Sequence, residues 1–152
     1  SDRLFNVNEL LHEVLLTLGP QLKKTPYKIE LNCPDDLMVT SKPGPINQIL
    51  INLILNSVIH GFEERDSGLI QINIMLLSGQ LHISYLDNGK GIDQAIRTKV
   101  FDPFITTKRG EGGRGLGLHL VYNLVTQALG GTINLDSEPG KGVNFDINFP
   151  VH

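Results

Sequence analysis

Apolar residues recur at intervals of three and four positions along three stretches of the chain, which is the spacing of one helix face. The stretches are FNVNELLHEVLLTLGPQL (residues 5–22), PGPINQILINLILNSVIHG (residues 43–61) and LGLHLVYNLVTQAL (residues 116–129). Asn6 or Asn8 is available to cap the first helix. Pro43 or Pro45 suits the first turn of the second. The pattern predicts three amphipathic helices.

Six other short runs are rich in strand-forming residues, and several alternate apolar and polar positions. They are YKIELNC (27–33), LMVT (37–40), LIQINIMLL (69–77), QLHISYLD (80–87), GTINLDS (131–137) and GVNFDINF (142–149). Ser-Gly at 78–79 and EPGKG at 138–142 indicate two hairpins. We expect one α/β domain over residues 1–152, a two-layer sandwich with a mixed sheet of about five strands packed against three helices.

The composition is that of a folded chain without strong basic character. Of its 152 residues 40% are hydrophobic, the net charge is -3, and no block is rich in Lys or Arg, so nucleic acid is not expected as a partner. Cys33 is the only cysteine, so no internal disulfide can form. No apolar run approaches the ~18 residues of a membrane span, and we expect no membrane contact by this domain itself.

The second predicted helix carries a polar stripe along an otherwise apolar sequence. Its members, spaced four residues apart on one helix face, are Gln48, Asn52, Asn56 and His60. Such residues could hydrogen-bond neighbouring strands or face water at the helix edge. They could instead line a phosphate channel, because an amide oxygen such as that of Asn56 suits Mg²⁺ bound to phosphate.

Two glycine-rich segments flank a long stretch without periodicity. DNGKGID (87–93) follows a predicted strand, and GGRGLGL (112–118) leads into the third helix. Glycine lets the backbone approach a ligand, and free N–H groups at a helix N-terminus favour phosphate. Residues 113–118 therefore look like a phosphate cradle, although two ordinary turns would have the same composition. Asp87 could cap a turn, or accept a hydrogen bond from the exocyclic amine of adenine, which guanine lacks at that ring position.

GEGGRG (110–115) also satisfies the G-x-G-x-x-G pattern of dinucleotide-binding folds, and Asp136 comes about 20 residues later. That fingerprint needs an apolar strand immediately before its first glycine. DPFITTKR (102–109), with a proline and two basic residues, stands there instead. We therefore set the dinucleotide interpretation aside.

Together these segments resemble the catalytic, ATP-binding domain of sensor histidine kinases, in the superfamily that includes DNA gyrase and heat-shock chaperone ATPases. NQILINLILNSVIHG (47–61) resembles the N box, DNGKGI (87–92) the first glycine box, FDPFITTK (101–108) the F box and GGRGLGLHLV (112–121) the second glycine box. The boxes come in the family's order and span nearly the whole chain. The resemblance implies a protein histidine kinase that binds ATP and Mg²⁺ and transfers the γ-phosphate to a histidine on a separate domain.

The resemblance also implies roles for individual residues. Asn56 corresponds to the magnesium ligand, with Asn52 beside it as a second catalytic residue, and Asp87 to the carboxylate that recognises adenine. Residues 101–114 correspond to a mobile lid over ATP, anchored by its two phenylalanines. The ATP-binding residues that we expect are Asn52, Asn56, His60, Asp87, Gly89, Gly91, Ile92, Phe104, Thr107, Lys108, Gly113, Arg114, Gly115, Leu116, Gly117 and Leu118.

Three positions depart from the family pattern. Ile59 stands where many members carry a basic residue next to phosphate, so Lys108 or Arg114 would have to supply that charge. Arg114 replaces a small hydroxyl residue, and Asn144 replaces a common threonine in the last strand. These departures concern the details of phosphate contact rather than the class of protein.

The resemblance implies partners as well. These are the dimerisation and phosphoacceptor domain of the same protein and the receiver domain of a response regulator, in the cytoplasmic part of a sensor kinase. His12-Glu13 lacks the proline of an acceptor motif, so we interpret His12 as an ordinary helix histidine.

Two alternatives stay open. An ATP-hydrolysing relative would carry a glutamate one turn before the magnesium asparagine, where this chain has Asn52, which cannot take a proton. The other alternative is a non-enzymatic module that binds nucleotide or a partner and transfers nothing.

Overall fold

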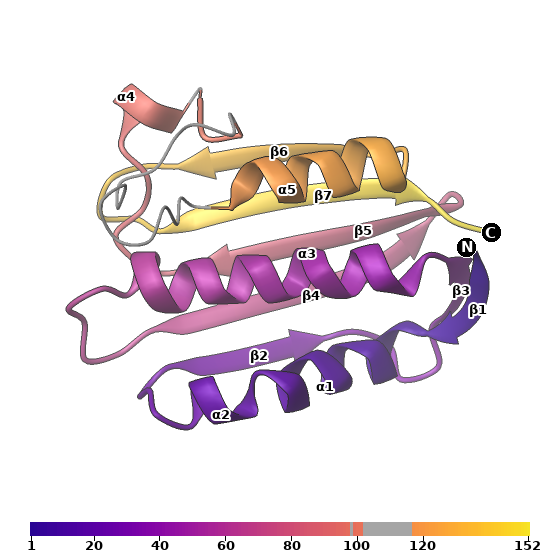
Figure 1. Ribbon diagram of the computed structural model, residues 1–152, viewed down its shortest axis with the longest axis horizontal. Coiled ribbons are helices and arrows are strands. Elements are labelled where there is room, and N and C mark those ends of the chain that lie inside the picture. Colours follow the sequence, from indigo (N-terminus) through magenta and orange to yellow (C-terminus); the bar gives the residue numbers. More distant parts are fainter. Residues whose placement is uncertain (98, 102–116) are drawn as a thin grey trace.

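The computed structural model describes residues 1–97, 99–101 and 117–152, which form two layers (Figure 1). One layer is a five-stranded sheet in the order β2-β4-β5-β7-β6, and β1 pairs separately with β3. The strands are β1 (Arg3–Asn6), β2 (Lys28–Asn32), β3 (Met38–Ser41), β4 (Leu69–Leu77), β5 (Gln80–Asp87), β6 (Thr132–Ser137) and β7 (Val143–Pro150). In the large sheet β2 is parallel to β4 and the other neighbours are antiparallel. The predicted mixed sheet of five strands is confirmed, and its antiparallel pairs differ from the parallel sheet of dinucleotide-binding folds.

The second layer consists of helices, and α1, α3 and α5 run side by side across one face of the sheet (Figure 1). The helices are α1 (Val7–Thr17), α2 (Gly19–Leu22), α3 (Pro43–Asn56), α4 (Gln94–Arg97) and α5 (Leu118–Asn123). α3 and α5 each continue into a wider π turn, η1 (Ser57–Gly61) and η2 (Leu124–Ala128). Among the described residues, none of the helices is long and apolar enough to span a membrane.

The N-terminal helix is shorter than the predicted residues 5–22, because the first part of that range belongs to β1. Asn6, one of the two predicted caps, accepts a hydrogen bond from the Glu9 N–H at 2.9 Å through its side-chain oxygen. The helix ends at Thr17. Pro20 has no N–H with which to continue the hydrogen-bond ladder, and it lies instead in the separate turn α2.

The core lies between the two layers and matches the alternation of the strands. Leu81, Ile83 and Tyr85 of β5 are buried, whereas the residues between them are more exposed. α3 packs against the sheet with five buried residues, which are Ile46, Ile49, Leu50, Leu53 and Ile54. The next inward position of β5 is Asp87, so the strand's period of two carries a carboxylate into the core layer.

We expect Ile147→Ala in β7 to lower the free energy of unfolding by about 2–5 kcal/mol, because the replaced side chain is fully buried and a cavity would remain. Urea unfolding followed by circular dichroism measures the change. Met75→Ala in β4 is the matched control: that side chain is 56% exposed, and its loss should cost less than about 0.5 kcal/mol. Similar losses in the two variants would contradict the placement of the core.

Candidate functional site

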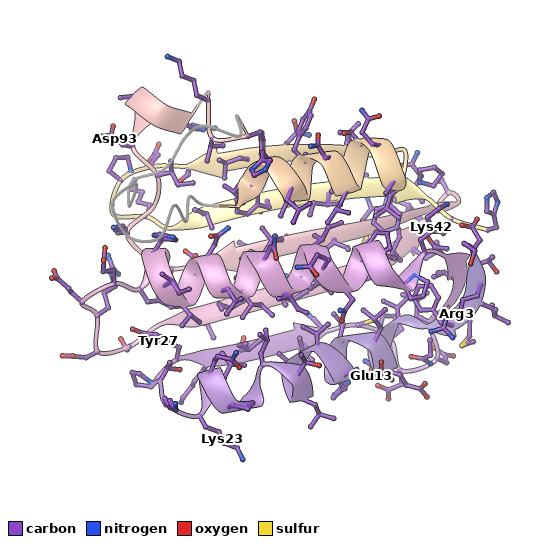
Figure 2. The ribbon with its side chains drawn as sticks, in the orientation of Figure 1. Arg3, Glu13, Lys23, Tyr27, Lys42 and Asp93 are labelled. Atoms are coloured by element: carbon purple, nitrogen blue, oxygen red, sulfur yellow. The ribbon has the colours of Figure 1, made fainter. Side chains whose placement is uncertain are left out.

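A cavity of ≈ 310 Å³ lies between α3 with η1, the C-terminal end of β5 and the β6–β7 hairpin. Six of the residues expected to bind ATP line it, namely Asn56, His60, Asp87, Gly91, Ile92 and Leu118. Asp93 also lines the cavity, and Figure 2 shows it at the end of the molecule opposite Arg3 and Lys42. The fold thus gathers residues from the N box and both glycine boxes around one hollow.

Asp87 is the buried carboxylate of this cavity. Only 7% of the residue is exposed. Its Oδ1 accepts a hydrogen bond from the Gly89 N–H at 2.9 Å, and its Oδ2 accepts one from Ser57 Oγ at 2.6 Å. Asp87 therefore does cap its own turn, as one interpretation of the sequence held. Each carboxylate oxygen can accept a further hydrogen bond, so the same group can also serve a ligand.

Glycines allow the end of η1 to pack directly against the loop after Asp87. A Cβ at Gly61 would lie 2.9 Å from Asp87 Oδ2, and a Cβ at Gly89 would overlap the Gly61 carbonyl oxygen. That oxygen accepts a hydrogen bond from the Lys90 N–H at 2.9 Å. The absence of side chains at these two positions is what brings the helix end and the carboxylate together.

The β6–β7 hairpin holds the same loop from the other side. Gly91 has φ +76°, and a Cβ there would overlap the carbonyl oxygen of Glu138. Ser137 Oγ accepts a hydrogen bond from the Ile92 N–H at 2.8 Å and donates one to the Gly142 carbonyl oxygen at 2.7 Å. The loop that carries the first glycine box is therefore fixed by contacts to a hairpin 45 residues later in the chain.

The polar stripe of α3 divides into two halves. In the outer half, the exposed Gln48 donates a hydrogen bond from Nε2 to Asn52 Oδ1 at 2.7 Å, so the water-facing interpretation holds there. In the inner half, Asn56 and His60 line the cavity, and the Asn56 amide nitrogen is buried without a hydrogen-bond partner among the described residues. Asn52 is not part of the cavity wall, but its amide nitrogen lies 3.8 Å from where a Cβ of Gly117 would be.

The π turn η1 buries two polar side chains beside the cavity. Its hydrogen bonds span five residues, as in the bond from the Phe62 N–H to the Ser57 carbonyl oxygen at 2.8 Å. Ser57 and His60 are both buried within this turn. Single π turns occur frequently at functional sites, and this one, at the C-terminal end of α3, forms part of the cavity wall.

Ser57 and Tyr85 were not among the site residues expected from the sequence. The Tyr85 hydroxyl lies 2.6 Å from Ser57 Oγ and 2.9 Å from the Leu53 carbonyl oxygen, so it adjoins the group that contacts Asp87. Burial raises the pKa of Tyr85 well above its ordinary value, and the phenol keeps its hydrogen at neutral pH. A signal for Tyr85 was present, because it precedes Asp87 by two positions on a strand and so shares its face.

The last strand contributes apolar walls. Val143 and Phe145 line the cavity, whereas Asn144 between them does not. The Asn144 amide oxygen is buried and has no hydrogen-bond partner in the described ranges. Strand alternation therefore makes Val143, and not Asn144, the β7 residue beside Asp87, with which it is paired in register.

Several expected residues lie outside the described residues, and they are Phe104, Thr107, Lys108, Gly113, Arg114, Gly115 and Leu116. The expected lid also lies outside them, except for Phe101, whose ring packs against Tyr122 of α5 with 5.3 Å between ring centroids. Gly117 has φ +68° and is the N-cap of α5, immediately before Leu118. The start of the third helix is thus two residues later than predicted.

Comparisons with known proteins agree on one family. The model described as Histidine kinase-, DNA gyrase B-, and HSP90-like ATPase matches residues 41–152. Sporulation kinase A of Bacillus subtilis (strain 168) is 32% identical over 146 residues, which cover 95% of this chain and 23% of that protein. The nucleotide-free catalytic domain of histidine kinase ThkA superposes with a TM-score of 0.81 at 30% identity, covering 99% of this chain and 95% of that one. ThkA in complex with the response regulator protein TrrA gives a TM-score of 0.78 at 27% identity, covering 99% and 42%.

Gly91→Ala should destabilise the chain more than Gly140→Ala. Both glycines have a positive φ, so each alanine should cost about 1–2 kcal/mol of backbone strain. A Cβ at Gly140 would meet nothing within 4 Å, whereas one at Gly91 would overlap Glu138, which adds roughly 1–3 kcal/mol. Chemical unfolding of the two variants measures the difference. Equal losses of unfolding free energy in the two variants would mean that the contact between loop and hairpin contributes nothing to stability.

Proposed function

Because the chain belongs to the family of histidine kinase-, DNA gyrase B- and HSP90-like ATPases and is a catalytic domain of the histidine kinase type, we propose that it binds Mg-ATP and transfers the γ-phosphate to a histidine on a separate phosphoacceptor domain. One observation carries the proposal. The cavity has a buried carboxylate, Asp87, on one wall and a buried amide nitrogen without a described partner, that of Asn56, on the other.

Asp87 gives the cavity its preference among bases. The carboxylate can accept a hydrogen bond from the exocyclic amine of adenine, whereas the keto oxygen of guanine would face another acceptor. Leu53, Ile92 and Phe145 supply apolar lining around it, and the volume of ≈ 310 Å³ is at the small end of ligand sites. These features fit an adenine base better than a guanine base.

Asn56 fits the phosphate end. Its buried amide N–H needs an acceptor, which a phosphate oxygen would provide, and its amide oxygen is the kind of ligand that Mg²⁺ takes. Among the described residues no group of three or more His, Cys, Asp or Glu could hold a metal ion. Mg²⁺ is often bound by one or two protein groups together with substrate phosphates, so the proposal needs no such group. When bound, the ion would neutralise charge on the phosphate oxygens.

Asn52 supports transfer to histidine over hydrolysis. It stands where an ATP-hydrolysing relative would carry a glutamate, and an amide cannot take a proton from water. A neutral imidazole already presents a lone pair on one ring nitrogen and needs no such base. The residues of this chain would then bind and orient the phosphates while the acceptor histidine supplies the nucleophile.

The partners are inferred from the same proposal. The chain spans 23% of the length of Sporulation kinase A, so an acceptor histidine on another domain of a longer protein is compatible with the relatives. The complex of ThkA with TrrA supports a response regulator as the next acceptor. The proposal places this domain in the cytoplasm, where ATP is available to it.

Asp87→Asn should weaken ATP binding by about 1–3 kcal/mol, because an amide N–H would replace part of the acceptor that the adenine amine needs. Titration calorimetry with ATP and GTP measures both the loss and the preference of the parent chain. Asp93→Asn is the matched control, since it makes the same charge change at an exposed residue of the cavity wall. Equal affinity of the parent chain for ATP and GTP would overturn the role given to Asp87.

Asn52→Glu should raise the rate of ATP hydrolysis above the slow rate expected of the parent chain, because it introduces a base beside the phosphate end. Phosphate release measures the rate. Asn52→Gln is the control: it has the same length as glutamate and can still contact Gln48, but it cannot take a proton. Rapid hydrolysis by the parent chain, or no difference between the Glu and Gln variants, would contradict this account.

A further inference from the structure

Three buried oxygen contacts link the helix layer to the carboxylate of the cavity. The Tyr85 hydroxyl lies 2.9 Å from the Leu53 carbonyl oxygen and 2.6 Å from Ser57 Oγ. Ser57 Oγ in turn lies 2.6 Å from Asp87 Oδ2. Tyr85 is 0% exposed and Ser57 2%, so these contacts are shielded from bulk water.

The number of hydrogens decides the direction of this chain of contacts. Two hydroxyl hydrogens serve three contacts, and two oxygens 2.6 Å apart repel each other unless a hydrogen lies between them. The Leu53 carbonyl oxygen already receives the backbone N–H of Ser57. Tyr85 can therefore donate to Ser57 Oγ, and Ser57 to Asp87 Oδ2, without leaving a buried group unpaired. This direction delivers a donor to the carboxylate.

We propose that Ser57 and Tyr85 are positioning residues that hold Asp87 in the orientation that selects a purine with an exocyclic amine. The proposal rests on the function proposed above and adds the determinant of its base selectivity. Ser57 fixes Oδ2 from the helix side while the Gly89 N–H fixes Oδ1 from the loop side. With both oxygens held, the carboxylate cannot rotate, and its remaining lone pairs stay directed at the ligand.

A purely structural role is the competing explanation, because the same contacts also tie η1 to β5. The two roles differ in what they predict for ligands. A positioning role affects only ligands that donate to Asp87, whereas a structural role weakens every ligand of the cavity alike. A ligand pair that differs only in the exocyclic amine therefore separates them.

The experiment compares ATP with purine riboside triphosphate, which lacks the exocyclic amine, by titration calorimetry on the 152-residue chain. Ser57→Ala should lose about fivefold to twentyfold in affinity for ATP and less than about twofold for the analogue. Tyr85→Phe keeps the ring that fills the core and should lose a smaller factor, again for ATP alone. The double variant should match Ser57→Ala, because Tyr85 acts only through Ser57.

Two controls match the side chains that are removed. Ser41→Ala removes a buried serine hydroxyl in β3, and Tyr27→Phe removes a phenol hydroxyl that donates to the backbone at Phe62. Both should leave the ratio of the affinities for ATP and the analogue at the parent value. Ser57→Thr, which keeps a hydroxyl at position 57, should return that ratio from the Ser57→Ala value to the parent value.

Equal losses for ATP and the analogue in the Ser57 and Tyr85 variants would overturn the proposal in favour of the structural role. Unchanged affinity for ATP in Ser57→Ala and Tyr85→Phe would overturn it as well. If the parent chain binds ATP and the variants give either of these results, the proposed function still stands. A parent chain that binds neither ligand would instead overturn the proposed function, and this inference with it.

Discussion

A carboxylate that strand alternation carries into the core layer must find hydrogen-bond partners, since burying a charge without them costs several kcal/mol. Much of the local structure around Asp87 meets that requirement. Gly89 supplies a backbone N–H from the loop, and Ser57 supplies a hydroxyl from the π turn. Gly61 leaves room for the carboxylate beside the helix end. The cavity exists at this place because these elements converge on one buried group.

The two ends of the cavity are built from different kinds of contact. Backbone hydrogen bonds hold the end around the first glycine box, from the Lys90 N–H to the Gly61 carbonyl and from the Gly140 N–H to the Lys90 carbonyl. Such bonds do not depend on the identity of the Lys90 side chain, which lies near the surface in an ion pair with Glu63. The other end presents the side-chain amide of Asn56, whose nitrogen has no partner in the described part of the chain. One end is therefore held by the backbone, whereas the other presents a side-chain group that the proposed ligand would pair.

The periodicity of apolar residues was sufficient to predict the sheet and the three main helices, because the buried face of each element produces that periodicity directly. The periodicity did not predict β1, because the four residues of this strand run into the apolar pattern of α1 without a break. It also treated the stripe on α3 as one face. An interval of four residues says which side chains lie together, but not which of them a neighbouring element covers, so Gln48 and Asn56 were not distinguished. Ser57 was missed for the same reason, because its role depends on Tyr85 from a strand 28 residues later.

The π turn makes the number of residues between Asn56 and Gly61 as important as their identity. Relative to an α-helix, a turn closed by bonds across five residues accommodates one extra residue, and η1 forms such a turn directly after Asn56. A deletion in Ser57–Gly61 could restore α-helical hydrogen bonding, but each residue removed rotates the remainder of the turn by about 100°. His60 would then leave the wall and Gly61 would no longer face the carboxylate. Length, as much as residue type, is thus under constraint in this segment, because the number of residues after Asn56 decides which side chains reach the cavity.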